Sequence, residues 1–267
     1  MLEIVTLRQV GCFFFNPSQP DIIYFVPSPQ RTGSARESSR DAQCKRLKPT
    51  EPRPVRAVAS FHVGIDRSVT ATILLVRHAA HVELGRTLSG RRRDVALSEE
   101  GLEQAEIVGD LLGVEPITAV YSSPRERAYY TARRIAEPHE HKVEIVDALD
   151  EVDFGDWTGM AFSQLEGDPA WMEWNEARAA ARPPNGESMA AAVERAAAAL
   201  QALAAEHNGE EIVCVSHCDI IRGALAWCLG LPLDNLLRFD VDPASVSRIA
   251  LGSWGARVMS VNERLYQ

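Results

Sequence analysis

Residues 71–79 read ATILLVRHA, a run that is apolar apart from Thr72 up to Val76 and then turns abruptly to Arg77 and His78. A continuous apolar run of this length is typical of a strand buried on both faces of a sheet. In open α/β sheets, ligands bind beyond the carboxyl ends of the strands. The stretch therefore predicts a central strand over Ala71–Val76 and a charged site at its end.

Strand and helix patterns alternate on the C-terminal side of this run. The further predicted strands are 117–121, 143–146, 211–216, 245–251 and 257–262. The predicted helices are 98–112, 125–136, 161–179, 188–206 and 220–229, and Ser98 and Ser188 are expected to cap two of them. Alternation of this kind predicts an α/β fold, with three α/β/α layers around a mostly parallel sheet.

The first 69 residues differ from the rest in composition. They carry ten Lys/Arg and six Asp/Glu, a net charge of +4, whereas residues 70–267 have a net charge of −13. Residues 27–56 are rich in Pro, Ser and Arg and lack apolar periodicity, so they cannot bury enough apolar surface to offset their ordering entropy. We predict a disordered extension over 1–69 and one folded domain over 70–267. A basic tail or an organelle-targeting segment would explain the extension, but we favour one without function.

Composition also limits the partners and the compartment. The net charge of −9 argues against a broad nucleic-acid or acidic membrane surface. No apolar run approaches the roughly 20 residues of a membrane span, and the N-terminus is a poor match to a signal peptide. The five cysteines are an odd, scattered set and predict a reduced, cytoplasmic protein: Cys12, Cys44, Cys214, Cys218 and Cys228.

Ionisable residues follow four of the predicted strands. Arg77 and His78 follow the first, Arg127 lies beyond the second, Glu151 beyond the third, and His217 directly after the fourth. Two guanidinium groups match a phosphate dianion, because each offers forked and permanently charged donors. A neutral imidazole can serve as a nucleophile and a carboxylic acid as a proton donor. The pattern predicts phosphoryl chemistry at one edge of the sheet.

Four motifs make the chain resemble a known family. LLVRHA, SSPRERAYYTA, LDEVDFGDWTG and VSHCDIIRG are similar to the successive motifs of the histidine phosphatase superfamily, also called the phosphoglycerate mutase-like family. PPNGES, before the helix predicted at 188–206, is similar to another signature. The resemblance covers about residues 73–262 and implies the phosphoglycerate mutase-like fold, with residues 70–267 as the catalytic domain.

The resemblance also implies a role for each residue at the strand ends. His78 matches the nucleophile that becomes phosphohistidine, and Arg77 and Arg127 match the phosphate-binding arginines. His217 matches the second histidine, which binds the phosphoryl oxygens, and Glu151 matches the proton donor. The family uses no metal, and this chain has no HExxH or paired CxxC pattern, so we expect neither a metal nor a cofactor.

Some site assignments stay open at this stage. Asp153 is an alternative to Glu151 as the proton donor, although Glu151 fits the motif better. His81 is expected at the substrate mouth. The run Arg91, Arg92 and Arg93 either contacts a second anionic group of the substrate there or is a solvated surface.

The chain also departs from the family pattern at three positions. Ala79 stands where Gly is usual, His81 where many members have a hydroxyl residue, and Arg125 where SSPL is common.

We therefore predict a metal-independent phosphomonoester hydrolase that acts through phosphohistidine on a small phosphorylated metabolite. The alternatives are a phosphoglycerate mutase and a non-catalytic protein that binds a phosphorylated ligand. Family mutases carry a long insertion between the acid motif and the second histidine, whereas only sixty-five residues separate Glu151 from His217 here. The expected partner is a small phosphorylated substrate and neither nucleic acid nor a membrane; whether the protein forms a homodimer is left open.

Overall fold

A computed structural model of the protein describes residues 70–265, in which six strands form one mixed sheet with the order β3-β2-β4-β1-β5-β6. The strands are β1 (Thr70–Arg77), β2 (Ile117–Ser122), β3 (Val143–Ile145), β4 (Glu211–Ser216), β5 (Val246–Gly252) and β6 (Gly255–Glu263). The first four run parallel to one another, and β5 and β6 add an antiparallel hairpin beside β1. The expectation of disorder over 1–69 falls outside the described residues.

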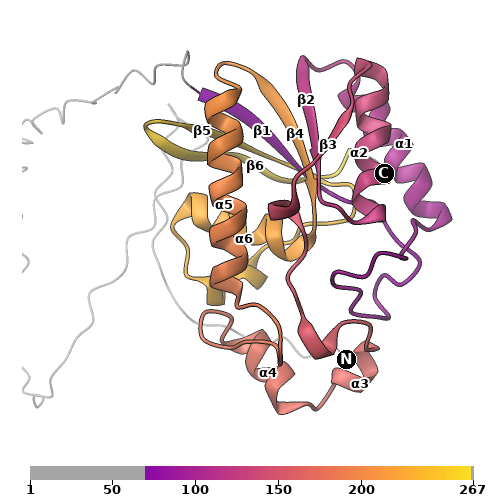
Figure 1. Cartoon of the computed structure of the whole chain (residues 1–267), viewed down its shortest axis with the longest axis vertical. Helices are drawn as coiled ribbons and strands as arrows, with labels where there is room; N and C mark the ends of the chain where they lie inside the picture. The colour runs from indigo at the N-terminus through magenta and orange to yellow at the C-terminus, as the bar shows by residue number, and fades with distance from the viewer. Residues whose placement is uncertain (1–69, 266–267) are drawn as a thin grey trace, which may run out of the picture. The chain divides into compact units, whose positions relative to one another are not determined.

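Helices cover both faces of the sheet, as expected for three layers (Figure 1). The α-helices are α1 (Glu99–Leu112), α2 (Glu126–Ala136), α3 (Phe162–Leu165), α4 (Pro169–Glu176), α5 (Met189–Glu206) and α6 (Cys218–Leu229). Short 3-10 helices are η2 (Glu137–His139), η3 (Asp147–Leu149), η4 (Gly155–Trp157) and η5 (Leu233–Arg238). None of the helices between residues 70 and 265 is long and apolar enough to cross a membrane.

The apolar run of β1 is buried on both faces, as its sequence predicts. Leu74 and Val76 pack into one core with side chains of α1 and α2. Ile73 and Leu75 point to the opposite face and pack with side chains of α5 and α6. Because alternate side chains of a strand point to opposite faces, one apolar stretch forms the centre of both cores.

The stretch 161–179, predicted as one helix, forms two short ones instead. Gly167 lies between α3 and α4 with a φ of +88°, a left-handed conformation that glycine adopts without steric cost. Asp168 then accepts hydrogen bonds from the backbone N–H groups of Ala170 and Trp171, and Pro169 occupies the first turn of α4. A cap and an N-terminal proline start a new helix at this point, so the single-helix prediction was wrong.

The two predicted serine caps are confirmed. The Ser98 side chain accepts a hydrogen bond from the N–H of Gly101 at the start of α1. The Ser188 side chain accepts one from the N–H of Ala191 at the start of α5. Both helices therefore begin where the sequence places them, which fixes the loops that precede them.

Candidate active site

The two histidines at the strand ends lie side by side. β1 and β4 are parallel neighbours, with Arg77 paired to Ser216, so the residues that follow them in the chain emerge together. The rings of His78 and His217 have centroids 5.1 Å apart, and both side chains are buried. The strand register thus joins two residues that are far apart in the sequence.

His78 is held as a neutral imidazole with a defined tautomer. Its Nδ1 lies 2.8 Å from the carbonyl oxygen of Ala79, an acceptor, so Nδ1 carries the proton and Nε2 is unprotonated. Burial lowers the pKa of His78 well below its usual value, and the positive charges of Arg127 and Arg77 lower it further. The result is a nucleophilic nitrogen that is unprotonated at neutral pH.

Arg127, in the first turn of α2, connects both histidines. Its Nε donates to Nε2 of His78 at 3.2 Å, and its Nη2 donates to Nδ1 of His217 at 3.2 Å. A further bond to the carbonyl of Gly90 fixes the guanidinium. Burial lowers the pKa of Arg127 to about 10, so the group stays charged at neutral pH. It is placed to bind an anion between the two rings.

His217 is oriented by a chain of polar groups behind it. Because the Arg127 guanidinium can only donate, His217 Nδ1 accepts, and its Nε2 donates to Ser123 Oγ at 2.7 Å. Ser123 Oγ in turn donates to Asp150 Oδ1 at 3.4 Å. Burial, followed by the charge of Arg127, lowers the pKa of His217 well below its usual value. The chain fixes both the ring orientation and the tautomer.

Asp150 is paired with Arg125, the residue that departs from the SSPL pattern. Arg125 donates from Nε to Asp150 Oδ1 at 2.8 Å and from Nη2 to Asp150 Oδ2 at 2.7 Å, a forked and buried ion pair. Arg125 also donates to the backbone carbonyl of Arg91. The departure from the family pattern therefore has its partner inside the acid motif, directly behind His217.

Glu151 and Asp153, the two candidates for the proton donor, lie in different environments. Glu151 is buried and lines the same cavity as His78 and Arg127. Burial, and then the nearby charge of Asp219, raises the pKa of Glu151 to about 7. Asp153 does not line that cavity; its side chain is 43% exposed and pairs with Arg91 at 3.6 Å.

Two glycines let the acid motif lie against the PPNGES turn. A Cβ on Gly155, which has a φ of +51°, would lie 2.1 Å from the carbonyl oxygen of Pro184. A Cβ on Gly186 would lie 2.3 Å from the carbonyl oxygen of Asp153. The N–H of Glu187 completes the contact by donating to that same Asp153 carbonyl at 2.9 Å. The turn before α5 thus holds the segment that carries Glu151.

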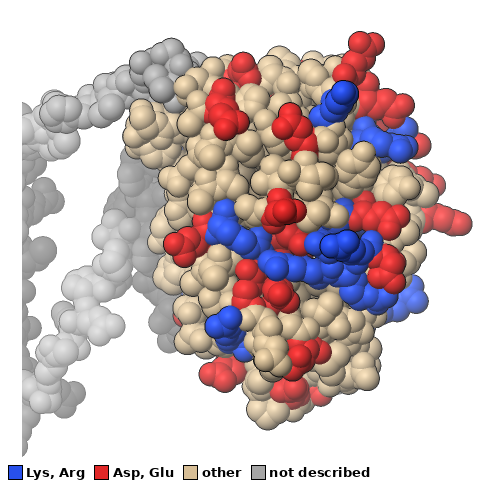
Figure 2. All heavy atoms as spheres, in the orientation of Figure 1, with Lys and Arg blue, Asp and Glu red and all other residues tan. Residues whose placement is uncertain are grey.

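A cavity of about 150 Å³ lies beside His78, whereas His217 is fully buried and is not among its lining residues. Its lining includes Arg77, His78, His81, Arg127 and Glu151. Figure 2 shows Lys and Arg side chains as a band across one face of the molecule, with Asp and Glu side chains on both sides of the band. Positive and negative groups are therefore interleaved on this face.

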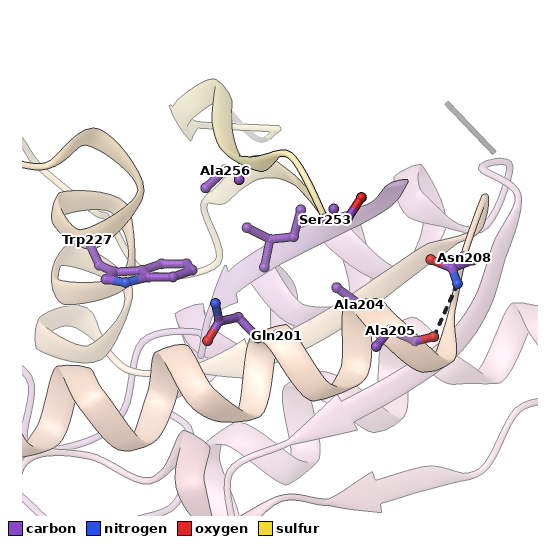
Figure 3. A pocket seen from close by; sticks show the side chains of 10 residues that line it. Gln201, Ala204, Ala205, Asn208, Trp227, Ser253 and Ala256 are labelled. Atoms are coloured by element: carbon purple, nitrogen blue, oxygen red, sulfur yellow. Dashed lines mark hydrogen bonds between the residues drawn. The ribbon is translucent and has the colours of Figure 1, made fainter. Parts of the chain in front are cut away.

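A second and larger hollow, of about 310 Å³, lies between α5, α6 and the β5–β6 hairpin (Figure 3). Its lining contains no titratable side chain and includes Gln201, Trp227 and Gly252. Gly252 pairs with Thr70, the first residue of β1, so this hollow lies at the end of the strand opposite His78. It lacks the groups for acid–base or nucleophilic chemistry.

The residues expected at the substrate mouth take different positions. His81 lines the cavity, and burial together with the charges of Arg127 and Arg77 lowers its pKa to about 4. Arg91 pairs with Glu187 at 2.7 Å, and Arg92 pairs with Glu83 at 2.6 Å. Arg93 is exposed, and none of these three arginines lines the cavity.

Ala79, which replaces the usual glycine, needs no unusual backbone. It is buried, it is absent from the residues of positive φ between 70 and 265, and its N–H donates to Thr131 Oγ1 at 3.0 Å.

Among residues 70–265, no group of three or more His, Cys, Asp or Glu side chains could hold a metal ion.

The model of the histidine phosphatase superfamily (branch 1) matches residues 73–264. The chain belongs to the histidine phosphatase superfamily. Phosphoserine phosphatase 1 of Hydrogenobacter thermophilus is 34% identical over 182 residues, which cover 66% of this chain and 85% of that protein. An acid phosphatase of Mycobacterium tuberculosis is 35% identical over 182 residues, covering 65% of this chain and 83% of its own length.

The fold agrees with this membership of the superfamily. The structure of a mycobacterial glucosyl-3-phosphoglycerate phosphatase matches with a TM-score of 0.66 and 26% identity, covering 73% of this chain and 99% of that one. The predictions of the family and of its α/β fold are confirmed.

Sequence reasoning missed the residues that support the histidine phosphatase site from behind. Ser123, Asp150 and Glu187 were not expected to contribute, although the structure places each in contact with a site residue or its loop. The departure at Arg125 was the one available signal, because an arginine in a position usually occupied by leucine needs a buried acidic partner.

Proposed function

We propose that this histidine phosphatase is a metal-independent phosphomonoesterase that works through phosphohistidine at His78. The observation that carries the proposal is the unprotonated His78 Nε2, which accepts a hydrogen bond from Arg127 at 3.2 Å, in a cavity where Arg77 and Arg127 have no ion pair with a carboxylate among residues 70–265. The buried Nε of Arg77 also has no hydrogen-bond partner among residues 70–265. Two unneutralised guanidiniums supply the positive charge that a phosphate dianion needs.

In the first step, His78 Nε2 attacks phosphorus and the bond from phosphorus to the ester oxygen breaks. The leaving oxygen takes the proton of Glu151, whose pKa of about 7 leaves a substantial protonated fraction at neutral pH. The products of this step are the free alcohol, an N-phosphorylated His78 and the carboxylate of Glu151.

In the second step, the Glu151 carboxylate takes a proton from a water molecule, and the water oxygen attacks phosphorus. The bond from phosphorus to His78 Nε2 breaks, inorganic phosphate leaves, and both residues return to their starting states. One carboxyl group thus acts first as acid and then as base, as microscopic reversibility of the proton transfer allows.

We assign His217 to binding of the phosphoryl oxygens, because its Nδ1 lies beside the Arg127 guanidinium and its ring centroid lies 5.1 Å from that of His78. A neutral His217 with a lone pair at Nδ1 cannot donate from that nitrogen to a phosphoryl oxygen. The charge of a bound dianion raises the pKa of a neighbouring imidazole, so His217 gains a proton as substrate binds.

Hydrolysis is favoured over mutase activity by the short connection between the acid and the second histidine. Residues 155–216 form η4, α3, α4, α5 and β4, which leaves little chain to close over the phosphohistidine. A mutase must exclude water from that intermediate and return the phosphoryl group to its product.

We also propose a cytoplasmic location, because Cys214, Cys218 and Cys228 are all free thiols.

The test is to incubate the purified protein with phenyl phosphate, measure phosphate release, and trap the intermediate by acid-free quenching after a few milliseconds. We expect turnover that EDTA leaves unchanged and a phosphoenzyme that is labile in acid and stable in base. Loss of turnover on chelation, restored by a divalent ion, would contradict the proposal. Rapid conversion of 3-phosphoglycerate to 2-phosphoglycerate in the presence of 2,3-bisphosphoglycerate would identify a mutase instead.

A further inference from the structure

Part of the wall of the catalytic cavity is apolar. Besides the residues already described, the lining includes the apolar side chains of Leu84, Leu88, Phe154 and Phe162, together with the hydroxyl groups of Thr87 and Ser89 and the thiol of Cys218. Leu84 is 37% exposed, whereas Phe154 is only 3% exposed. A ligand whose phosphate lies between Arg77 and Arg127 would therefore place the rest of its body against leucine and phenylalanine side chains.

This apolar wall is held in place by backbone hydrogen bonds between two loops. The N–H of Leu88 donates to the carbonyl of Met160 at 2.9 Å, and the N–H of Gly159 donates back to Leu88 at 2.8 Å. The N–H of Phe162 donates to the carbonyl of Arg86 at 2.9 Å. The Phe162 ring also packs on Trp171, with centroids 6.2 Å apart. The wall is thus formed before a ligand binds.

Among residues 70–265, only two permanently charged cations line the cavity, Arg77 and Arg127, and both lie beside His78. Arg91 and Arg92 are neutralised by acidic partners outside it. Arg86 lies in a neighbouring hollow that also contains Glu99 and Glu100. The charge of Arg77 and Arg127 together equals that of one phosphate dianion, so no lining cation is left for a second anionic group.

Besides Glu151, the lining contains a second acidic group. Asp219, in the first turn of α6, lines the cavity and pairs with Arg178 at 2.9 Å. Arg178 itself is buried and lies over the ring of Trp174, so it is not available to a ligand. A carboxylate on the substrate body would lose its hydration here without gaining a free cation, since Arg178 is already paired with Asp219.

We propose that this site selects phosphate monoesters whose alcohol part is uncharged and apolar, and that it discriminates against esters that carry a second anionic group. The inference rests on the proposed phosphatase function and names the substrate class of that same site. Leu84 and Phe162 are the specificity-determining residues, because they line the cavity without belonging to its catalytic groups.

Matched substrate pairs test the two parts of the proposal separately. Glycerol 3-phosphate and 3-phosphoglycerate differ in one carboxylate, and benzyl phosphate and glycerol 3-phosphate differ in the polarity of a body attached through a similar alcohol. We expect kcat/KM to be at least about tenfold higher for glycerol 3-phosphate than for 3-phosphoglycerate, and about tenfold higher again for benzyl phosphate. Equal or reversed ratios would overturn the inference and leave the phosphatase function intact. If the protein releases phosphate from none of these three substrates, the result would contradict the proposed function itself.

Charge at the cavity mouth gives a second, independent test. Leu84→Arg places a cation on the wall at a partly exposed position, and we expect it to raise the ratio of kcat/KM for 3-phosphoglycerate over glycerol 3-phosphate by about tenfold. Val114→Arg is the matched control, since Val114 is 89% exposed and lies just before β2, at the end of the sheet opposite His78. An unchanged ratio in Leu84→Arg, or the same change in both variants, would overturn the inference.

Removal of an aromatic side chain tests the apolar contact. We expect Phe162→Ala to lower kcat/KM for benzyl phosphate several-fold while kcat/KM for glycerol 3-phosphate stays nearly constant. Circular dichroism and the melting temperature verify the fold of the variant. An equal loss for both substrates would assign Phe162 a structural role only and overturn its part in specificity.

Discussion

Two pairs of arginines in the same region of the molecule have opposite electrostatic surroundings. Arg77 and Arg127 line the catalytic cavity and form no ion pair with a carboxylate among residues 70–265. Arg91 and Arg125 lie just behind them, and both pair with Asp150. The comparison teaches that the number of arginines near a site says little about its positive charge, because only unpaired guanidiniums can bind an anion.

The same contrast separates two layers of the site. The layer that faces the cavity contains His78, Arg127 and Glu151, which are buried without full compensation. The layer behind it contains Asp150 and Arg125, which compensate each other. Buried groups without an oppositely charged partner have perturbed pKa values and can act on a substrate. Buried groups that are paired with an opposite charge instead hold other residues in position.

Replacement of the nucleophile, which belongs to the layer that faces the cavity, should lower the catalytic rate more than any other change. We expect His78→Ala to lower kcat for phenyl phosphate by about 10⁴-fold or more, because no other group can form the covalent intermediate. His139→Ala serves as the control, since His139 lies in η2, where its ring contacts the carbonyl of Leu112 and the ring of His141. Substantial turnover in His78→Ala would refute the mechanism.

The proton donor should give the next largest effect and a distinctive pH profile. Glu151 must be protonated in the first step, and its pKa is about 7, so kcat/KM for an alkyl phosphate should fall above about pH 7. Glu151→Gln should lower kcat/KM by about 10²-fold to 10⁴-fold and remove this alkaline limb.

Asp153 provides the matched control for Glu151. Asp153→Asn changes a carboxylate that is 43% exposed and outside the cavity lining, so the alkaline limb should persist. A limb that disappears in Asp153→Asn and persists in Glu151→Gln would reverse the assignment of the donor.

Changes in the layer behind the cavity should lower kcat/KM less, and they should also lower the melting temperature. Arg125→Leu leaves Asp150 buried without its forked partner, and we expect kcat/KM to fall by about 10-fold to 100-fold as His217 loses its orientation. The melting temperature should fall as well, because Asp150 then keeps only the more distant Arg91, at 3.6 Å, and a buried charge that loses its main partner is destabilising.

The double variant Arg125→Leu with Asp150→Asn separates stability from catalysis. Removal of both charges should restore much of the melting temperature, since paired buried charges can often be replaced together at little cost. Activity should stay low, because a neutral amide oxygen accepts the Ser123 hydrogen bond more weakly than a carboxylate does. Full recovery of activity would show that Asp150 does not position His217.

Removal of the residues that precede Ser68, which lie outside both layers of the site, should change activity and stability least. A chain that begins at Ser68 keeps all of β1 and both cores, so its melting temperature should change by no more than about 3 °C and its kcat should be unchanged. Calorimetry and a phenyl phosphate assay test this. A large loss in either would mean that residues 1–67 contribute to the folded domain.

Much of the fold and part of the candidate site could be predicted from the sequence. The run Ala71–Val76 is apolar enough to indicate a strand buried on both faces, and Arg77 and His78 follow it directly. His217 follows the strand 211–216 in the same way. Each of these predictions depends on residues that are neighbours in the chain, where propensity and periodicity are sufficient.

Only the tertiary structure distinguishes Glu151 from Asp153 as the group inside the cavity. The two residues share one short segment, and their exposure depends on how the turn at Pro184 and Gly186 packs against it. The neutralisation of Arg91 by Glu187, 96 positions later, is likewise a contact between distant parts of the chain.

The sequence by itself therefore determined the order of the strands along the chain, the residues at their ends and the family. Tertiary structure alone decided which charges remain unpaired beside those residues. The physical reason is that a side chain's pKa and free charge are set by burial and by partners within a few ångströms. For Arg125 and Asp150, and for Arg91 and Glu187, those partners come from segments that only folding brings together.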